Sequence, residues 1–209
     1  MPLVVNTVCQ SNMNRSMAAH LKLQDVQGLQ LVSSGVGEKV KIPGDRPDRP
    51  NVYDFGTPYS QIEADLRSKD EALYLRNNLI PLVARNKGIK TCPQRFTEVW
   101  AGTPCDIIFS FEERVYDTVL EVIQLTESHP AALSRVHVFN LTTNDTKEDA
   151  EKGADLSVEF LQDLVDTPDW ENHVPELVQR FVDKHRQPLL HCLLVLPDLD
   201  PWSQLPRPT

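Results

Sequence analysis

Short apolar runs alternate along the chain with longer segments in which apolar residues recur every three or four positions. The runs have the length and composition of buried strands, and the recurring segments are typical of helices packed on a sheet. The expected strands are residues 3–8, 29–32, 105–110, 136–141 and 189–196, and the expected helices are residues 16–26, 57–74, 79–83, 112–123, 146–165 and 174–181. This alternation predicts a three-layer α/β fold with helices on both faces of a central, mainly parallel sheet.

Residues 35–57 interrupt the alternation. Glycine and proline recur through this segment and break regular structure, yet it is too apolar for a free linker. We therefore predict an inserted, ordered loop or small hairpin after the second strand, packed near the loop that follows the first strand. Thr57 and Pro58 are a typical N-cap and first residue for the helix that follows.

Composition limits the domain organisation and the partners. The 209 residues, of which 40% are hydrophobic, suffice for one sizeable core, so we expect one domain at residues 1–196 and a Pro-rich, disordered tail at residues 197–209. No apolar run reaches the roughly 18 residues of a membrane span, and no signal peptide is recognisable, so we expect an intracellular protein that binds no membrane. A net charge of -9 argues against direct nucleic-acid binding.

The cysteines do not indicate a metal or a disulfide framework. Cys9, Cys92, Cys105 and Cys192 are widely spaced, and no pair of them has the spacing of a zinc site. We therefore expect reduced thiols, no metal and no cofactor.

Cys9 ends the first apolar run, and Arg15 and Ser16 follow where the first helix is expected to begin. In a strand-to-helix loop, backbone N–H groups and the positive end of the helix dipole favour a tetrahedral oxyanion such as phosphate. The same field stabilises a thiolate, which makes Cys9 a candidate nucleophile. Arg15 can grip two phosphate oxygens with its planar fork, and Ser16 can donate its hydroxyl group to the sulfur.

A phosphate-binding loop is therefore predicted between this strand and this helix. Its asparagines tolerate left-handed backbone, which a tight loop requires. A buried cysteine at the end of a strand is otherwise the commoner fate of this residue type, but the position of the motif at a βα turn favours phosphate chemistry. The loop consists of Gln10, Ser11, Asn12, Met13, Asn14 and Arg15.

Transfer of a phosphoryl group also needs an acid that protonates the leaving oxygen. Asp145 follows the fourth expected strand, on the edge of the sheet where ligands of α/β proteins bind. Asp200, in the tripeptide Asp200-Pro201-Trp202, is similar to the acid loop of low-molecular-weight tyrosine phosphatases but lies in the tail. We favour Asp145, although a carboxylate beside a helix cap such as Thr146 is also an ordinary surface feature.

Three further stretches carry a family resemblance: VKIPGDRPDRPNVYDFGTPY at 40–59, ARNKGIKTCPQRF at 84–96 and FEERVYD at 111–117. With the cysteine motif they resemble the Ssu72 family, the symplekin-associated phosphatases of the RNA polymerase II C-terminal domain. The similarity runs from about Leu3 through the fourth strand and more weakly onward. The chain departs from the family at two positions. It has Thr142 where the family usually has Asp and Phe111 where the family usually has Cys, and neither is a proposed catalytic residue.

The resemblance implies a modified low-molecular-weight-phosphatase fold and a function. The enzyme would remove phosphate, through a cysteinyl-phosphate, from serine at the fifth position of the heptad repeat, with the following proline in cis. Its partners would be the phosphorylated C-terminal domain and a symplekin-like scaffold, which implies a nuclear protein of transcription and mRNA 3'-end processing. The resemblance assigns catalysis to Cys9, Arg15, Ser16 and Asp145 and makes Lys41 and Pro43 candidates for substrate binding, although ordinary loop packing explains the last two equally well.

Three alternatives stay open. A low-molecular-weight tyrosine phosphatase is the nearest, although many of these carry a second loop cysteine where this chain has Asn14. An arsenate reductase shares the fold and the Cys-(x)5-Arg loop, but the later cysteines lack the close partner in sequence that a redox relay uses. A phosphopeptide-binding module that has lost turnover is the third, and the intact Cys9, Arg15 and Ser16 argue against it.

Overall fold

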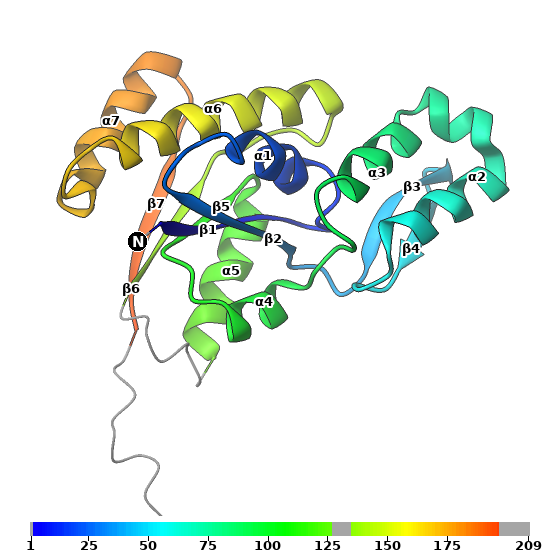
Figure 1. The fold of residues 1–209 in the computed structure, drawn as a ribbon, viewed down its shortest axis with the longest axis horizontal. Coiled ribbons are helices and arrows are strands. Elements are labelled where there is room, and N and C mark those ends of the chain that lie inside the picture. Colours follow the sequence, from blue (N-terminus) through cyan, green and yellow to red (C-terminus); the bar gives the residue numbers. More distant parts are fainter. Residues whose placement is uncertain (1, 127–134, 197–209) are drawn as a thin grey trace, which may run out of the picture.

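The structure is a computed structural model that describes residues 2–126 and 135–196. Its central sheet has five strands in the order β2-β1-β5-β6-β7 (Figure 1). The first four strands of that order are parallel, and β7 pairs antiparallel with β6. This confirms the predicted mainly parallel sheet. The strand bounds are β1 (Leu3–Cys9), β2 (Leu29–Gly35), β5 (Ile107–Ser110), β6 (Arg135–Asn140) and β7 (Leu190–Val195).

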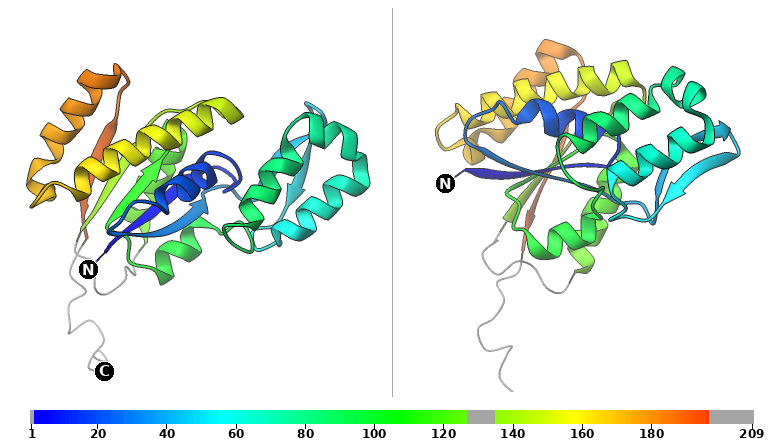
Figure 2. Two further views of the ribbon diagram at one scale, coloured as in Figure 1. Left: turned by 45° about the horizontal axis from the view of Figure 1, so that its top comes forward. Right: turned by 45° about the vertical axis from the view of Figure 1, so that its right-hand side comes forward.

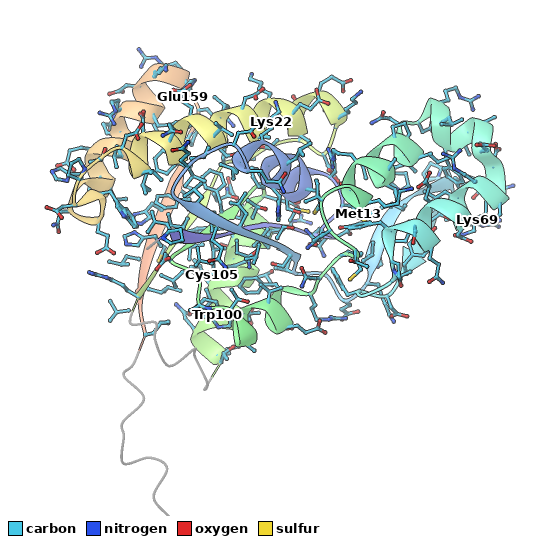
Figure 3. All side chains as sticks on the ribbon, in the orientation of Figure 1. Met13, Lys22, Lys69, Trp100, Cys105 and Glu159 are labelled. Carbon is cyan, nitrogen blue, oxygen red and sulfur yellow. The ribbon has the colours of Figure 1, made fainter. Side chains whose placement is uncertain are left out.

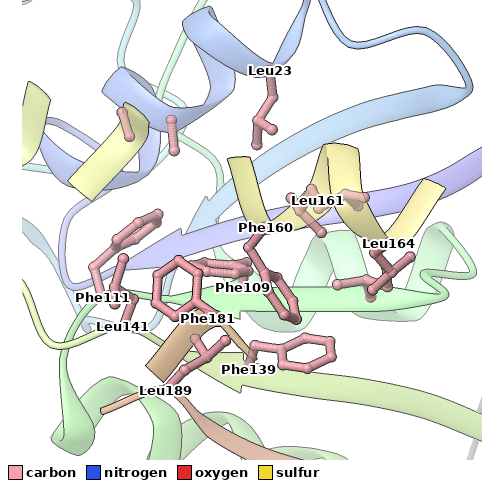
Figure 4. Packing of buried hydrophobic residues seen from close by; sticks show 14 of the residues in the cluster. Leu23, Phe109, Phe111, Phe139, Leu141, Phe160, Leu161, Leu164, Phe181 and Leu189 are labelled. Atoms are coloured by element: carbon pink, nitrogen blue, oxygen red, sulfur yellow. The ribbon is translucent and has the colours of Figure 1, made fainter. Parts of the chain in front are cut away.

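Helices cover both faces of the sheet, as predicted (Figures 1 and 2). One face carries α1 (Arg15–Leu23), α6 (Lys147–Val165) and α7 (Val174–His185), and the other carries α4 (Phe96–Gly102) and α5 (Glu113–Leu125). Stacked and edge-on aromatic rings fill the first interface, where Phe139 and Phe160 have ring centroids 5.0 Å apart (Figure 4). Such complete burial of large apolar groups is the main stabilising contribution to the fold.

The predicted insertion is a β-hairpin, β3 (Val40–Arg46) and β4 (Arg49–Tyr53), which is separate from the central sheet. It packs with α2 (Tyr59–Arg76) and α3 (Leu79–Lys87) at one end of the molecule, where the labels β3, β4, α2 and α3 gather in Figure 1. We call these four elements the hairpin–helix unit. Its apolar cluster also takes in Met13, which lies between the unit and the sheet (Figure 3).

Several expected boundaries were wrong. The first helix ends at Leu23, not at residue 26, although Val26 still reaches the core. The cap of α2 is Pro58 rather than Thr57, because Pro58 keeps extended backbone (φ -56°, ψ 138°) and the helix begins at Tyr59. α2 is broken at Asp70, whose carboxylate accepts a hydrogen bond from the N–H of Leu73 and so caps the second part of the helix.

Two elements were not expected from the sequence, α4 and the short 3-10 helix η1 (Trp170–His173). Both are too short for helical periodicity to be visible in the sequence. The predicted tail at residues 197–209, and with it Asp200, lies outside the described residues. Within the described part of the chain, no helix combines the length and apolar character that crossing a bilayer would take.

Candidate phosphate-binding site

The motif lies where the sequence predicts it, between the last residue of β1, Cys9, and the first residue of α1, Arg15. Asn12 takes the left-handed conformation, with φ of 52°. The adjacent end of β2 must be a glycine, because a Cβ atom on Gly35 would lie 2.9 Å from the backbone nitrogen of Asn12. Parallel pairing of β1 with β2 thus brings the loop against a strand end that has no side chain.

The sulfur of Cys9 is held by a chain of two hydrogen bonds. Asn12 Nδ2 donates to Ser16 Oγ over 3.0 Å, and Ser16 Oγ lies 3.1 Å from Cys9 Sγ. Because the amide already donates to this oxygen, the hydroxyl hydrogen of Ser16 is available to the sulfur. Ser16 is therefore placed to donate a hydrogen bond to the sulfur of Cys9.

The carbonyl groups of the loop are turned towards the hairpin–helix unit. Tyr59 donates its hydroxyl group to Asn12 O over 2.8 Å, Asn86 Nδ2 donates to Met13 O over 2.7 Å, and Arg85 donates to Met13 O and Asn14 O. Burial raises the pKa of Tyr59, so its hydroxyl group stays protonated and remains a donor.

The matching N–H groups point the other way. C=O and N–H point in opposite directions across a trans peptide, and the described residues contain no cis peptide bond. Among the residues that the structure describes, the N–H groups of residues 11–15 find no acceptor in the protein. The loop is therefore a set of free donors next to the sulfur, which is the arrangement that binds an oxyanion.

Arg15 is buried, with 6% of its surface exposed, and most of its donors are occupied. One terminal nitrogen, Nη1, donates to Thr143 O over 2.9 Å and to Phe111 O over 3.4 Å. The other, Nη2, donates to Glu112 Oε2 over 2.7 Å. Nε is buried without a hydrogen bond and lies 3.5 Å from Asp145 Oδ1. The guanidinium group is thus fixed from behind, and the edge formed by Nε and Nη2 keeps two N–H groups for a bidentate anion.

A cavity of about 240 Å³ opens over the loop and brings together Cys9, Arg15, Lys41, Pro43 and Asp145. Asn12, within the loop, and Ser16, at the start of α1, are fully buried and do not line the cavity. Further wall residues come from β3, from the start of α3 and the loop before it, and from the start of α6, namely Ile42, Asn77, Asn78, Leu79, Leu82, Thr146 and Lys147.

The hairpin is joined to the loop directly. Ser11 Oγ donates to Lys41 O and accepts from Lys41 N, each over 3.1 Å. The structure therefore places Lys41 and Pro43 at the wall of the cavity, and the expectation that the insertion packs near the first loop is confirmed.

Sequence reasoning missed the residues that hold the loop and its arginine. Glu112 lies in the stretch FEERVYD, and Arg85 and Asn86 lie in ARNKGIKTCPQRF, so the family resemblance marked both stretches without assigning these side chains. Tyr59 lies at the end of the first stretch. No local pattern predicts such contacts, because each partner is more than forty positions from the loop in sequence.

The described residues contain no group of three or more His, Cys, Asp or Glu side chains that could hold a metal ion, and all four cysteines are free thiols.

A strand-end cysteine, a loop of free N–H groups and a fixed arginine at the carboxyl edge of a parallel sheet define the class of α/β proteins with a Cys-(x)5-Arg anion-binding loop. Within this class the chain belongs to the Ssu72-like protein family, whose family model matches residues 3–196.

Known proteins are similar over almost the whole chain. SSU72 of Danio rerio, a phosphatase of the RNA polymerase II C-terminal domain, is 43% identical over 192 residues, which cover 92% of this chain and 96% of that protein. The crystal structure of the serine phosphatase of RNA polymerase II CTD from Drosophila melanogaster has a TM-score of 0.87 at 41% identity and covers 93% of this chain and 100% of that one. Another D. melanogaster structure, Ssu72 with symplekin bound to a cis peptidomimetic CTD peptide that carries phosphoserine at position five, has a TM-score of 0.86 at 40% identity, with coverage of 93% and 98%.

Proposed function

We propose that the protein is a cysteine-dependent phosphatase that removes phosphate from serine at the fifth heptad position of the RNA polymerase II C-terminal domain. The proposed chemistry rests mainly on the guanidinium group of Arg15, whose edge formed by Nε and Nη2 keeps unpaired N–H groups. Its Nε is buried without a hydrogen bond, beside unpaired loop N–H groups and the sulfur of Cys9. Buried donors without an acceptor are costly unless a ligand satisfies them, and phosphate has the charge and shape to do so.

The reaction proceeds in two balanced steps. The thiolate of Cys9 attacks phosphorus, the bond from phosphorus to the serine oxygen breaks, and Asp145 gives its proton to that oxygen. A water molecule then attacks the cysteinyl-phosphate, Asp145 takes a proton from it, and the sulfur leaves as a thiolate that accepts the hydrogen bond of Ser16. Inorganic phosphate and the serine hydroxyl group are the products.

The substrate follows from the relatives. They are named as phosphatases of the RNA polymerase II C-terminal domain, and one of the similar structures holds a cis peptidomimetic with phosphoserine at position five together with symplekin. In this chain Lys41 and Pro43 would contact the peptide beside the phosphate, since both line the cavity. A symplekin-like scaffold is the proposed partner, and a nuclear location follows from both partners.

We further propose that residues 1–196 form one phosphatase domain. The family match at 3–196 supports this, as does the shared packing of the central sheet and the hairpin–helix unit around one loop.

Replacement of the nucleophile tests the chemistry. Cys9→Ser should abolish hydrolysis of a small aryl phosphate and leave the melting temperature close to that of the wild type, because serine fits the site but is a far weaker nucleophile at neutral pH. Cys192→Ser, in β7, is the matched control and should keep full activity. Turnover by Cys9→Ser at the wild-type rate would eliminate the cysteinyl-phosphate.

A peptide panel tests the substrate. Heptad peptides phosphorylated at the second, fifth or seventh position should be compared with a phosphotyrosine peptide, and the fifth position should be preferred. Preference for phosphotyrosine would instead indicate a tyrosine phosphatase, and binding of phosphopeptides without turnover would indicate a silent binding module.

A further inference from the structure

Asn14 stands immediately before α1, at the position where an asparagine usually caps a helix. Here its side chain makes no capping hydrogen bond, and its backbone (φ -109°, ψ -81°) departs from the usual cap conformation. The helix therefore does not depend on the amide of Asn14, which is free to serve another purpose.

That amide reaches across to the loop after β6. Asn14 Nδ2 donates to Asp145 Oδ1 over 3.0 Å and to Thr146 O over 3.2 Å. The two loops are 131 positions apart in sequence, and both contribute to the wall of the same cavity. Asn14 thus links the loop that holds phosphate to the loop that carries the carboxylate.

Asp145 has few other restraints. Its side chain is 63% exposed, and its only other contact in the described part of the chain is the 3.5 Å approach of Oδ1 to Arg15 Nε. An exposed carboxylate samples several rotamers, and holding it in one costs side-chain entropy. The two hydrogen bonds of one amide, to the carboxylate and to the backbone next to it, restrict both the loop and the side chain.

We propose that Asn14 is a positioning residue for the general acid. This inference rests on the proposed function. The amide donates to Oδ1, so the proton that is transferred is carried by Oδ2, and Oδ2 is held over the leaving oxygen. Asn14 belongs to the loop that begins at Cys9 and ends at Arg15. Its hydrogen bond therefore fixes the position of the acid relative to the nucleophile and the phosphate-binding loop.

The role has a chemical signature that a merely structural role lacks. A serine alkoxide is a poor leaving group that needs the proton, whereas a nitrophenolate leaves without one. Loss of acid positioning therefore slows hydrolysis of a phosphoserine peptide and spares a nitrophenyl phosphate. Distortion of the phosphate loop would slow both substrates together.

The experiment measures Asn14→Ala with both substrates. We expect kcat for the phosphoserine peptide to fall about tenfold or more, which is part of the roughly hundredfold or larger effect of a general acid, while kcat for nitrophenyl phosphate changes less than about threefold. Inhibition by inorganic phosphate should be unchanged, because the backbone donors and Arg15 remain. Asn144→Ala is the control, since Asn144 is an exposed asparagine next to Asp145 that donates no hydrogen bond to it.

Removing the acid completes the test. In an Asp145→Asn background, Asn14→Ala should cost less than about twofold further, because no proton is left to position. Three outcomes would contradict the role of Asn14. In the first, Asn14→Ala lowers kcat equally for both substrates, and in the second it lowers kcat for neither. In the third, its effect on kcat is as large in the Asp145→Asn background as in the wild type. Absence of any hydrolysis by the wild-type protein would instead overturn the proposed function.

Discussion

The central sheet and the hairpin–helix unit are built differently, and they contribute differently to the same loop. The strands β1 and β5 are almost wholly buried, whereas β3 begins with an alternation of buried and exposed residues. The sheet fixes the two ends of the loop, Cys9 through strand pairing and Arg15 through the carbonyl groups after β5 and β6. The unit fixes the middle of the loop through Tyr59, Arg85 and Asn86.

The difference shows that the register of the parallel strands is not sufficient to form the phosphate-binding site. Parallel strands bring their carboxyl ends together in any fold of this class, which places the cysteine and the arginine. The carbonyl groups of Asn12, Met13 and Asn14 are instead held by donors from the hairpin–helix unit, which is not part of the sheet. Variants of each region should therefore damage the site in different ways.

The largest effect is expected for Arg85→Ala in the hairpin–helix unit. It removes a charged donor from the carbonyl groups of Met13 and Asn14, and such hydrogen bonds contribute about 1.5–3 kcal/mol. We expect kcat/KM to fall roughly tenfold to a hundredfold for both aryl and peptide substrates, with weaker inhibition by phosphate.

Arg67→Ala in the same unit is the control. Arg67 forms ion pairs with Glu63 and Glu71 within α2 and donates no hydrogen bond to the loop, so its loss should leave kcat/KM unchanged. Equal activity of the two variants would show that the unit does not support the loop.

A smaller effect is expected for Gly153→Ala on the sheet side. A Cβ atom there would lie 2.7 Å from Thr143 Oγ1 and 2.8 Å from Thr143 Cγ2, so Thr143 must shift, and its carbonyl oxygen is the acceptor that holds Arg15. We expect phosphate affinity and kcat/KM to fall about tenfold, in line with the roughly 1–3 kcal/mol cost of overpacking.

Thr143→Ala should restore most of that loss in the double variant, because it removes both crowded atoms and keeps the backbone carbonyl group. Steady-state kinetics of the two single variants and the double variant measure the rescue. If the double variant is no better than Gly153→Ala alone, the contact with Thr143 is not the cause.

The last comparison concerns stability in acid rather than activity. None of the six histidines falls in residues 40–87, so the hairpin–helix unit contributes no histidine titration. His137 in β6 is 3% exposed, and burial, with His191 and Arg135 nearby, lowers its pKa from 6.5 to about 4. The unfolded chain therefore binds more protons between these values, so the free energy of unfolding should fall as the pH drops from about 6.5 towards 4. The loss has an upper limit of about 3 kcal/mol.

Urea unfolding at several pH values checks this. His137→Phe should make the stability less dependent on pH in that interval, and the exposed His173→Asn should not. An unchanged slope in His137→Phe would assign the acid sensitivity to other groups, such as His20, whose pKa burial also lowers to about 4.

The local pattern of apolar and polar residues was sufficient to predict the long strands and helices. The apolar runs of β1, β5 and β6 and the helical spacing of α5 and α6 are long enough to be recognised, and the Cys-(x)5-Arg spacing carries its own chemistry. The pattern failed at short or interrupted elements. The break of α2 at Asp70 falls inside one continuous helical pattern, and the brief α4 is held by burial of Phe96 and Trp100 in the core, which a propensity does not include.

The sequence by itself determined the class of fold, the presence of an ordered insertion and the residues with the chemistry for the site, because hydrophobic periodicity and the spacing of a motif are properties of neighbouring positions. Only the tertiary structure decided how these residues meet: which donors turn the loop carbonyl groups outward, which acceptors hold Arg15 from behind, and that Asn14 reaches Asp145. These contacts join positions that are about 50 to 130 residues apart, and their geometry is set by strand register and helix packing rather than by any local preference.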